Sequence, residues 1–537
     1  MPPGSLLKLV KGAYGLREAP RLWYLRAREI LQEAGFEEMQ TGRACFVLMD
    51  RTGKEPVNMG RLVLHVDDAC FAGEGPLWEK AMQHLRKKFI MGKEEYGDFT
   101  FLGRHVLQKK DFTVEIDQHD YLSTLQKVTV SRERRGQGGS PLTPKELHDY
   151  RSIVGQLAWP ARESMPQIAY AVSDLQQKVA QAEVNDLVHA NNVLFAAKRH
   201  AKQGQKLLFQ DLGPDVRLEV QHSGGKRSKF TKTKLAYPNL GLAAVHDASF
   251  MGQPGEGSQS AYCLVLCSTK LYEGKARTHL LDWGSSKIHR KMRSTLACEA
   301  ASAARAFDRG AYARVMLHEI ENGWRHQWDR YAQDPSSYRQ TWSEMCRQIP
   351  FALGTDCKSL YDVCTKQGSM PEERRVALDL LDVRESIEEM GDQIRWIPTD
   401  HMLVDCMTKT MPPDAMLAYL RHMEYAFKYD DVIKHTKREV AKQRKAAREQ
   451  KAATAGKQKK LQQLPQTDQC YDEYEQQEIN VVNNYDAYYP MFKYWYAPDK
   501  EDTILQYTGD YPALVTKHGY RVAYTMVAQE LCVKTEQ

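Results

Sequence analysis

Short apolar strands alternate with amphipathic helices along the first 130 residues. Residues 21–36, RLWYLRAREILQEAGF, carry apolar side chains every three or four positions and close at Gly35, which predicts a helix. Two apolar runs, residues 43–50 and 60–68, flank the polar stretch RTGKEPVN and are typical of a β-hairpin. A second helical pattern over residues 76–89 and further short strands continue the alternation, so this segment is predicted to be α/β.

Helical spacing dominates residues 143–210, and a new α/β pattern begins at residue 240. Three apolar strands come first, over residues 240–250, 260–268 and 279–286. A long helix over residues 294–320 follows, and then a strand, a helix, a strand and a final helix. This order predicts a mixed sheet that is covered by helices.

The hydrophobic pattern fades after about residue 430. Residues 434–460 are strongly basic and poor in large apolar side chains, which indicates a solvated helix or a disordered segment. The remainder is rich in Tyr, Asn and acids. The predicted fold class is a multidomain α/β and α+β protein with a disordered carboxyl-terminal tail, divided into residues 1–130, 131–225, 226–428, 429–465 and 466–537.

Composition narrows the class of protein. Of the 537 residues, 42% are hydrophobic and 27% are charged, as expected for a soluble globular protein with charged extensions. No stretch reaches the roughly 18 apolar residues of a membrane span, and the amino terminus has no secretory pattern. The 11 cysteines form no CxxC pair and are expected to be reduced thiols. We expect a cytoplasmic location, with the nucleus as the alternative, and no membrane partner.

Six acids stand against apolar elements and are candidate metal ligands. Asp67 and Asp68 end the run RLVLHVDD, where bare carboxylates are costly unless they are paired or bind a metal. The other four lie in a strand, on a helix among small residues, at a strand end and at the start of the last helix: Asp247, Glu299, Asp356 and Asp405. If the fold brings these four together, they offer the oxygen ligands that two divalent cations need. Otherwise each is an ordinary cap or surface residue.

The last four acids lie in four short segments, HDASF, ACEA, GTDCKSL and WIPTDHMLVDCMTK. In order and spacing these segments resemble the ribonuclease H motifs of copia-type (Pseudoviridae) retrotransposon Pol polyproteins. The resemblance implies that Asp247, Glu299, Asp356 and Asp405 are the acidic metal-binding set. It also implies Mg²⁺-dependent cleavage of the RNA strand of RNA–DNA hybrids, with two ions in the site and Mn²⁺ as an alternative ion. The last motif often reads LTK in the family, whereas this chain has MTK at residues 407–409.

The front of the chain resembles the same family. LLKLVKGAYGLREAPRLWY resembles the reverse-transcriptase segment K-x-L-Y-G-L-K-Q-A-P-R-x-W, HVDD resembles the polymerase motif YVDD, and FLGRHV resembles the primer-grip strand. YRSIVGQLAWPARESMPQIAYAV resembles the connection segment. The resemblance covers roughly residues 1–425. It implies a truncated reverse-transcriptase palm and thumb, followed by a ribonuclease H-like mixed sheet with flanking helices.

The resemblance also sets expectations for the pair Asp67 and Asp68. Polymerases of this family use a third aspartate on an earlier strand, which would precede Met1, and the fingers would be missing with it. His65 stands where the family usually has tyrosine. We therefore expect Asp67 and Asp68 to be a remnant polymerase site that binds metal weakly, and polymerase activity to be lost in this chain alone. We also expect the sheet edge beside this hairpin to be exposed.

Nucleic acid, above all an RNA–DNA hybrid, is the expected partner, together with other retroelement polypeptides. Arg17, Arg21, Lys87 and Lys88 are candidates to face a phosphate backbone, although charged faces of solvent-exposed helices are commoner. The intact acidic set favours a hybrid-cleaving enzyme. The alternative is a catalytically inactive nucleic-acid-binding or host interaction protein derived from a decayed retroelement.

Overall fold

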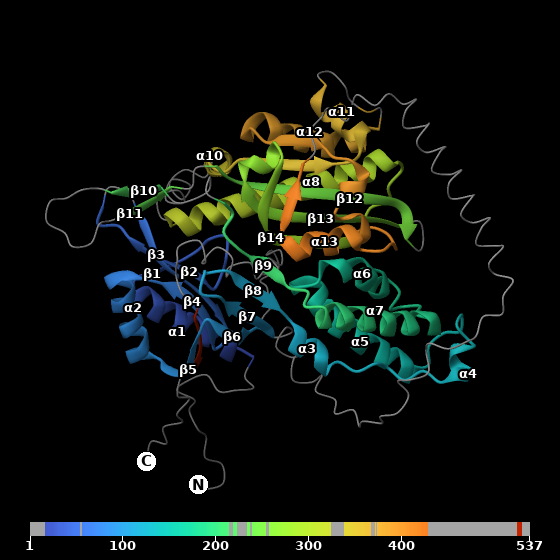
Figure 1. The fold of residues 1–537 in the computed structure, drawn as a ribbon, viewed down its shortest axis with the longest axis horizontal. Coiled ribbons are helices and arrows are strands. Elements are labelled where there is room, and N and C mark those ends of the chain that lie inside the picture. The colour runs from blue at the N-terminus through green and yellow to red at the C-terminus, as the bar shows by residue number, and fades with distance from the viewer. Residues whose placement is uncertain are drawn as a thin grey trace, which may run out of the picture. The chain divides into compact units, whose positions relative to one another are not determined.

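The computed structural model describes ten segments of the chain (Figure 1). The described residues are 17–53, 56–213, 219–222, 233–236, 239–253, 257–323, 338–366, 371, 373–427 and 523–528. All of them belong to one compact unit, made of residues 1–428 and 498–537. The predictions on residues 429–465 and on most of the tail lie outside the described residues.

A six-stranded antiparallel sheet lies at the amino-terminal end, in the order β1-β2-β3-β4-β18-β5. The strand bounds, in that order, are Phe36–Glu38, Cys45–Asp50, Val57–His65, Asp68–Gly73, Ala523–Ala528 and Ile90–Tyr96. Helices α1 (Ala19–Glu33) and α2 (Gly75–Lys88) share a core with one face of this sheet. Trp78 of α2 packs directly on Gly60 and Gly73, because a Cβ at either position would overlap its indole ring.

Strand β18 corrects two predictions. Because β18 is antiparallel to both β4 and β5, those two strands run parallel to each other, and the crossover through α2 leaves a gap one strand wide. Tyr524 of β18 pairs with Cys70 on one side and with Glu95 on the other. Since the backbone groups of β4 thereby find partners, the sheet edge beside the Asp67–Asp68 hairpin is not exposed. Residues 523–528, predicted to be disordered, are a strand for the same reason.

A second antiparallel sheet and a group of helices follow. The sheet has the order β6-β7-β8-β9, with bounds Asp98–Phe101, Arg104–Gln108, Val114–Asp117 and Leu207–Phe209. The helices are α3 (His119–Thr124), α4 (Arg132–Arg135), α5 (Pro144–Glu163), α6 (Ala169–Gln177) and α7 (Val184–Lys202). Thr143 begins α5 with a capping box, in which its hydroxyl accepts from the Glu146 N–H and the Glu146 carboxylate accepts from the Thr143 N–H. These helices bury a core of their own, as their spacing predicts.

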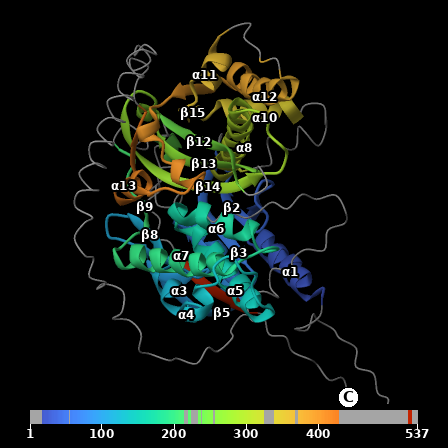
Figure 2. The same ribbon diagram turned by 90° about the vertical axis from the view of Figure 1, so that its right-hand side faces the viewer.

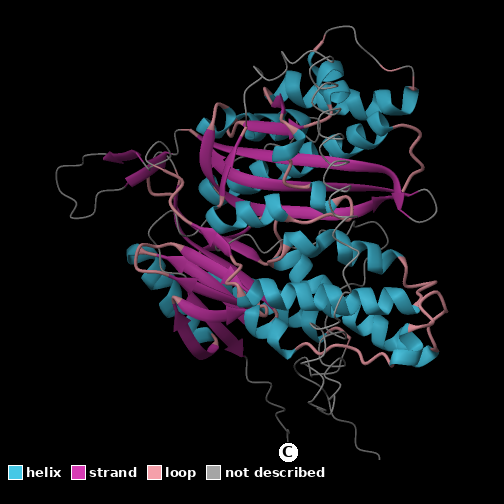
Figure 3. Ribbon diagram, turned by 45° about the vertical axis from the view of Figure 1, so that its right-hand side comes forward, coloured by secondary structure: helices cyan, strands magenta, loops and turns pink. Residues whose placement is uncertain are grey.

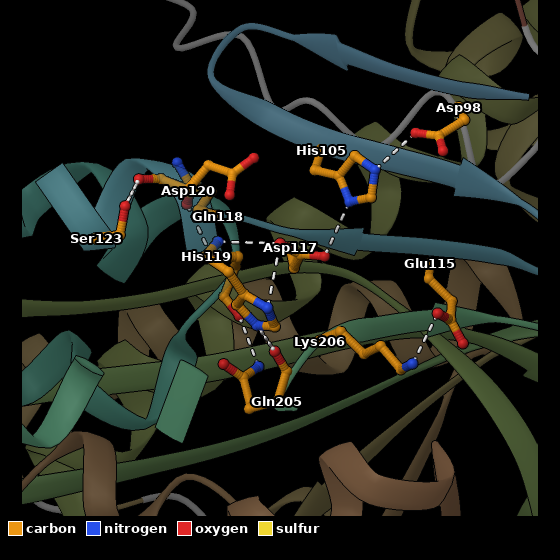
Figure 4. Close-up of polar contacts among 11 residues, drawn as sticks. Asp98, His105, Glu115, Asp117, Gln118, His119, Asp120, Ser123, Gln205 and Lys206 are labelled. Atoms are coloured by element: carbon orange, nitrogen blue, oxygen red, sulfur yellow. Dashed lines mark hydrogen bonds and ion pairs between the residues drawn. The ribbon is translucent and has the colours of Figure 1, made fainter. Parts of the chain in front are cut away.

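The His105 side chain on β7 contacts side chains on both neighbouring strands of this second sheet, β6 and β8 (Figure 4). Its imidazole on β7 lies 2.8 Å (Nε2–Oδ1) from Asp98 on β6 and 3.2 Å (Nδ1–Oδ2) from Asp117 on β8. The other Asp117 oxygen accepts from the His119 N–H and lies 3.5 Å from the His119 ring. Burial lowers the pKa of His105, but the hydrogen bonds to Asp98 and Asp117 outweigh it, and the net pKa lies above its usual value.

We expect a pH-dependent contribution of His105 to stability. Because its pKa is raised in the folded chain, the contribution is complete below about pH 6.5 and is lost as the pH rises through the higher folded value. The thermal midpoint of His105→Gln should therefore fall below that of the parent chain at pH 6 and approach it near pH 9. His148→Gln, at an exposed histidine on α5, is the matched control and should show no such convergence. A constant difference across this pH range would contradict the assignment.

The third sheet is mixed and has the order β16-β15-β12-β13-β14-β17. In that order its strands are Gln393–Trp396, Phe351–Thr355, Leu240–Gln253, Gly257–Ser268, Lys275–Ile288 and Glu424–Ala426. β12, β13 and β14 are antiparallel, whereas β15 pairs parallel to β12 and β16 parallel to β15. The helices of this part are α8 (Thr295–Asn322), α10 (Tyr338–Arg347), α11 (Lys358–Thr365), α12 (Arg374–Met390) and α13 (Asp414–His422).

Helix α8 packs along β12 and β13, and α12 packs on α8 (Figure 2). Helices therefore lie against the strands of the mixed sheet (Figure 3). The predicted mixed sheet with flanking helices is therefore confirmed. A separate hairpin, β10 (Glu219–His222) and β11 (Thr233–Ala236), precedes this sheet. None of the helices within the described residues is long and apolar enough to cross a membrane.

Candidate metal centre

Sheet register brings two of the candidate acids to the same place. Val245 of β12 is paired with Gly354 of β15, and the two strands are parallel. Asp247 stands two residues further along β12, and Asp356 stands two residues past Gly354, directly after β15 ends. The alternation of side chains along each strand therefore places both carboxylates on the same face at the same end of the sheet. Two carboxylates that are distant in sequence are thereby placed side by side.

Asp405 completes a cluster of three. One carboxylate oxygen from each of Asp247, Asp356 and Asp405 lies within 4.8 Å of the other two. Asp405 belongs to a short 3₁₀ turn, Asp405–Met407, and not to the final helix, where the sequence pattern had suggested it. The final helix begins at Asp414 because Pro412 and Pro413 precede it and proline is tolerated only at the first turn of a helix.

Glu299 lies beside this cluster without joining it. It stands on α8, is buried, and its Oε2 has no hydrogen-bond partner within the part of the chain that the structure describes. Burial raises the pKa of Glu299 well above its usual value, and the charges of Asp247 and Asp356 raise it further. His246, which is fully buried, places its Nδ1 3.7 Å from that oxygen. Glu299 is therefore close enough to interact electrostatically with the three aspartates.

Two residues next to Asp405 hold the aspartates in place. The Thr408 hydroxyl donates to the Asp247 carboxylate. Lys409 Nζ lies 2.8 Å from Oδ1 of Asp405 and 3.9 Å from Oδ2 of Asp247. The ammonium group therefore supplies one positive charge at the mouth of the cluster, where its side chain is about half exposed.

The carboxylates of the centre repel one another. Burial raises the pKa of Asp247 to about 7, and the neighbouring Asp405 and Asp356 contribute to the rise. Burial also raises the pKa of Asp356, against a hydrogen bond from Thr399. Lys409 offsets part of this repulsion, but one ammonium cannot balance three carboxylates. Bringing like charges this close favours a site that takes up a further cation.

The donor set fits a hard divalent cation. All three converging ligands are carboxylate oxygens, the type that Mg²⁺ and Mn²⁺ prefer, and no cysteine or histidine joins the three-residue cluster. Mg²⁺ commonly takes one or two carboxylates and completes its shell with water and substrate phosphate. Asp247, Asp356 and Asp405 are thus the residues that would hold the ion, with Glu299 adjacent.

Hydrogen bonds from strands β13 and β14 and from helix α6 support the Asp405 turn. The Ser285 hydroxyl on β14 donates to the Met407 carbonyl at 2.6 Å. Gln259 on β13 donates in turn to Ser285 at 2.8 Å and to Ser173 on α6 at 3.0 Å. Helix α6 is therefore connected to the acidic turn through a buried polar chain, and the helical segment supports the centre in addition to linking two sheets.

The remaining candidate residues lie elsewhere. Asp67 is in the turn of the β3–β4 hairpin and Asp68 is the first residue of β4, both partly exposed. They belong to no three-ligand cluster among the described residues. The basic candidates are all exposed on or beside the helices α1 and α2, namely Arg17, Arg21, Lys87 and Lys88. Lys88 forms an ion pair with Glu33 at 3.1 Å, as surface lysines often do.

Sequence reasoning missed Thr408, Lys409 and His246 as parts of the centre. A signal was present in DCMTK, because Thr408 and Lys409 follow Asp405 by three and four residues and so can return to its side chain in a helical turn. His246 precedes Asp247 and therefore points to the opposite face of β12. Only the packing of α8 shows that it meets Glu299 there.

Comparisons with known proteins agree with the motifs. Residues 2–134 match the family described as reverse transcriptase (RNA-dependent DNA polymerase). The chain is 31% identical over 188 residues to the retrovirus-related Pol polyprotein from transposon RE1 of Arabidopsis thaliana, a match that covers 33% of this chain and 12% of that protein. It is 27% identical over 207 residues to the putative transposon Ty5-1 protein YCL074W of Saccharomyces cerevisiae, covering 36% of this chain and 64% of that protein.

Solved structures give weaker matches. RNase H1 from Halobacterium salinarum is 12% identical, with 30% of this chain and 86% of that chain covered and a TM-score of 0.18. The foamy viral protease-reverse transcriptase in complex with an RNA/DNA hybrid is 9% identical, with 75% and 62% covered and a TM-score of 0.20. These scores are too low to establish a shared fold. The sequence similarities identify the chain as a relative of copia-type retrotransposon Pol polyproteins, with reverse-transcriptase family sequence over residues 2–134.

Proposed function

We propose that the chain hydrolyses the RNA strand of RNA–DNA hybrids at the centre formed by Asp247, Asp356 and Asp405, with Glu299 beside them. The observation that carries the proposal is the convergence of three aspartates from β12, the end of β15 and the Asp405 turn. The four-motif resemblance supports the choice of substrate. The loss of polymerase activity stays a prediction.

The chemistry follows from charge and position. A divalent ion held by these carboxylates supplies Lewis acidity and a water of lowered pKa. The three carboxylates would hold the ion against the scissile phosphate, and the register of β12 and β15 fixes the spacing of Asp247 and Asp356 before substrate binds. Thr408 orients the Asp247 carboxylate by donating to one of its oxygens. Lys409, about half exposed at the mouth, is placed to attract the substrate phosphate.

The test uses the full chain and a hybrid whose RNA strand carries the label. We expect RNA cleavage with Mg²⁺ or Mn²⁺, none with EDTA, and none of the same sequence presented as duplex DNA. Equal cleavage of single-stranded RNA would point to a contaminating ribonuclease. Failure to cleave the hybrid at any Mg²⁺ or Mn²⁺ concentration would overturn the proposal and favour the inactive nucleic-acid-binding alternative.

A further inference from the structure

Two buried polar side chains beside the aspartates lack hydrogen-bond partners. His246 is fully buried on β12, and neither of its ring nitrogens has a partner among the residues that the structure describes. Glu299 on α8 is 4% exposed, and its Oε2 is also without a partner there. His246 Nδ1 lies 3.7 Å from this oxygen, just beyond the length of a hydrogen bond. Because buried polar groups without partners are costly, a pair of them this close together calls for an explanation.

The backbone of β12 holds the Glu299 carboxylate near the end of β15. Burial raises the pKa of Glu299, and a hydrogen bond from the Ala248 N–H to the carboxylate acts in the opposite direction. β12 pairs with β15 as far as Val245 and Gly354, and Ala248 lies three residues beyond that pair. The carboxylate therefore stands beside β12 at the place where its pairing with β15 has ended, which is also where Asp356 follows β15.

The His246 ring is suited to hold the second oxygen of Glu299. Burial lowers the pKa of His246 to about 3, so the ring is uncharged and carries one N–H donor. The acceptor that each ring nitrogen meets decides which of them carries the proton, and the group that faces Nδ1 is Glu299 Oε2. A movement of about 0.5 Å would bring these two atoms within the usual range of an N–H···O hydrogen bond.

We propose that His246 is a positioning residue of the metal centre, whose Nδ1–H donates to Glu299 and fixes that carboxylate beside the aspartates. Groups that hydrogen-bond to the ligands of a metal orient those ligands, and the loss of one such group typically weakens metal binding or activity about 10- to 100-fold. His246 points to the face of β12 opposite to Asp247, so it acts on the centre through Glu299. The inference rests on the proposed function, because it requires that the aspartates hold a divalent ion.

The test measures the binding of Mn²⁺ to the full chain without nucleic acid, so the readout does not depend on cleavage. Electron paramagnetic resonance follows free Mn²⁺, and the ions bound at the centre are those whose binding is lost in Asp247→Asn. His246→Leu removes the N–H donor and should raise the Kd of these ions about tenfold. His246→Asn keeps an N–H donor near the place of Nδ1 and should remain within about threefold of the parental Kd.

The control is His200→Leu, at a buried histidine of α7 that contacts Gln167. It should bind Mn²⁺ as the parent does.

A purely structural role of His246 predicts a different pattern. His246→Leu replaces two buried nitrogens that lack partners by an apolar side chain of similar volume, so its thermal midpoint should lie at or above the parental value. His246→Asn leaves a cavity and should unfold at a lower temperature than the parent. The more stable variant is thus expected to bind Mn²⁺ more weakly. If His246 were only structural, the affinity for Mn²⁺ would instead follow the thermal midpoint.

Two outcomes separate this inference from the proposed function. A parental Kd for His246→Leu, with binding lost in Asp247→Asn, would overturn the role of His246 and leave the metal centre in place. Unchanged Mn²⁺ binding in Asp247→Asn would overturn both. Electron spin echo measurements add a further check. A coupling between bound Mn²⁺ and a nitrogen nucleus that disappears in His246→Leu would show that His246 binds the ion itself, and the positioning role would be wrong.

Discussion

Asp356→Asn and Asp247→Asn are each expected to reduce metal-dependent cleavage of the hybrid by roughly a thousandfold or more, ~4 kcal/mol of transition-state stabilisation. The amide keeps the shape of the side chain but removes one of the three converging charges. Single-turnover cleavage of the RNA-labelled hybrid by the full chain measures the effect. Asp400→Asn, at a highly exposed carboxylate five residues before Asp405, should retain parental activity.

The thermal midpoints of the two variants distinguish a direct loss of cleavage from a loss caused by misfolding. Burial and neighbouring carboxylates raise the pKa of Asp247 and Asp356, so removal of one charge relieves repulsion. Both variants should therefore unfold at or above the parental temperature, as residues kept for function often do when neutralised. Mg²⁺ should raise the thermal midpoint of the parent but not of the variants. Cleavage within tenfold of the parent in either variant would remove that aspartate from the centre.

The sequence predicted these aspartates because their surroundings are local. Asp247 follows an apolar strand and Asp356 ends another, and parallel strands place equivalent ends together. Their partners could not be predicted in the same way. The meeting of His246 and Glu299 depends on how α8 lies on β12, and the support of Met407 by Ser285 depends on a turn that packs against a third strand. Tertiary contacts of this kind do not affect the spacing of apolar and polar residues along the chain, so that spacing cannot predict them.

Strand β18 shows a second limit of sequence reasoning. Residues 523–528, AYTMVA, include the strand-favouring residues Tyr, Thr and Val, but they follow a long polar region and have no neighbouring strand in sequence, so nothing local shows which sheet they join. Their place is set by the crossover β4-α2-β5, which leaves a gap between two parallel strands. The two strands that border this gap, β4 and β5, lie about 430 residues earlier in the chain. A strand is needed between them because backbone groups left unpaired there would be costly when buried.

Asp392→Leu should be among the most destabilising single changes in the mixed-sheet region, by about 3–5 kcal/mol. Arg314 of α8 is fully buried and forms a bidentate pair with Asp392, with Nη1–Oδ1 at 2.5 Å and Nη2–Oδ2 at 2.8 Å. Its guanidinium also stacks on Phe351 at 5.2 Å. Removing the carboxylate leaves a buried cation without its counter-ion, and urea unfolding of the full chain measures the cost.

The double variant Arg314→Met/Asp392→Leu is the sharper half of this experiment. Burial raises the pKa of Asp392 even beside the guanidinium, so desolvation offsets much of the attraction within the pair. Replacing both groups by apolar ones should therefore recover most of the stability lost in Asp392→Leu. Equal destabilisation of the single and double variants would show that poorer packing of the new side chains, and not the unpaired charge of Arg314, lowers the free energy of unfolding. Recovery would show that the pair supplies little net stability, because the cost of desolvating both charges offsets their attraction.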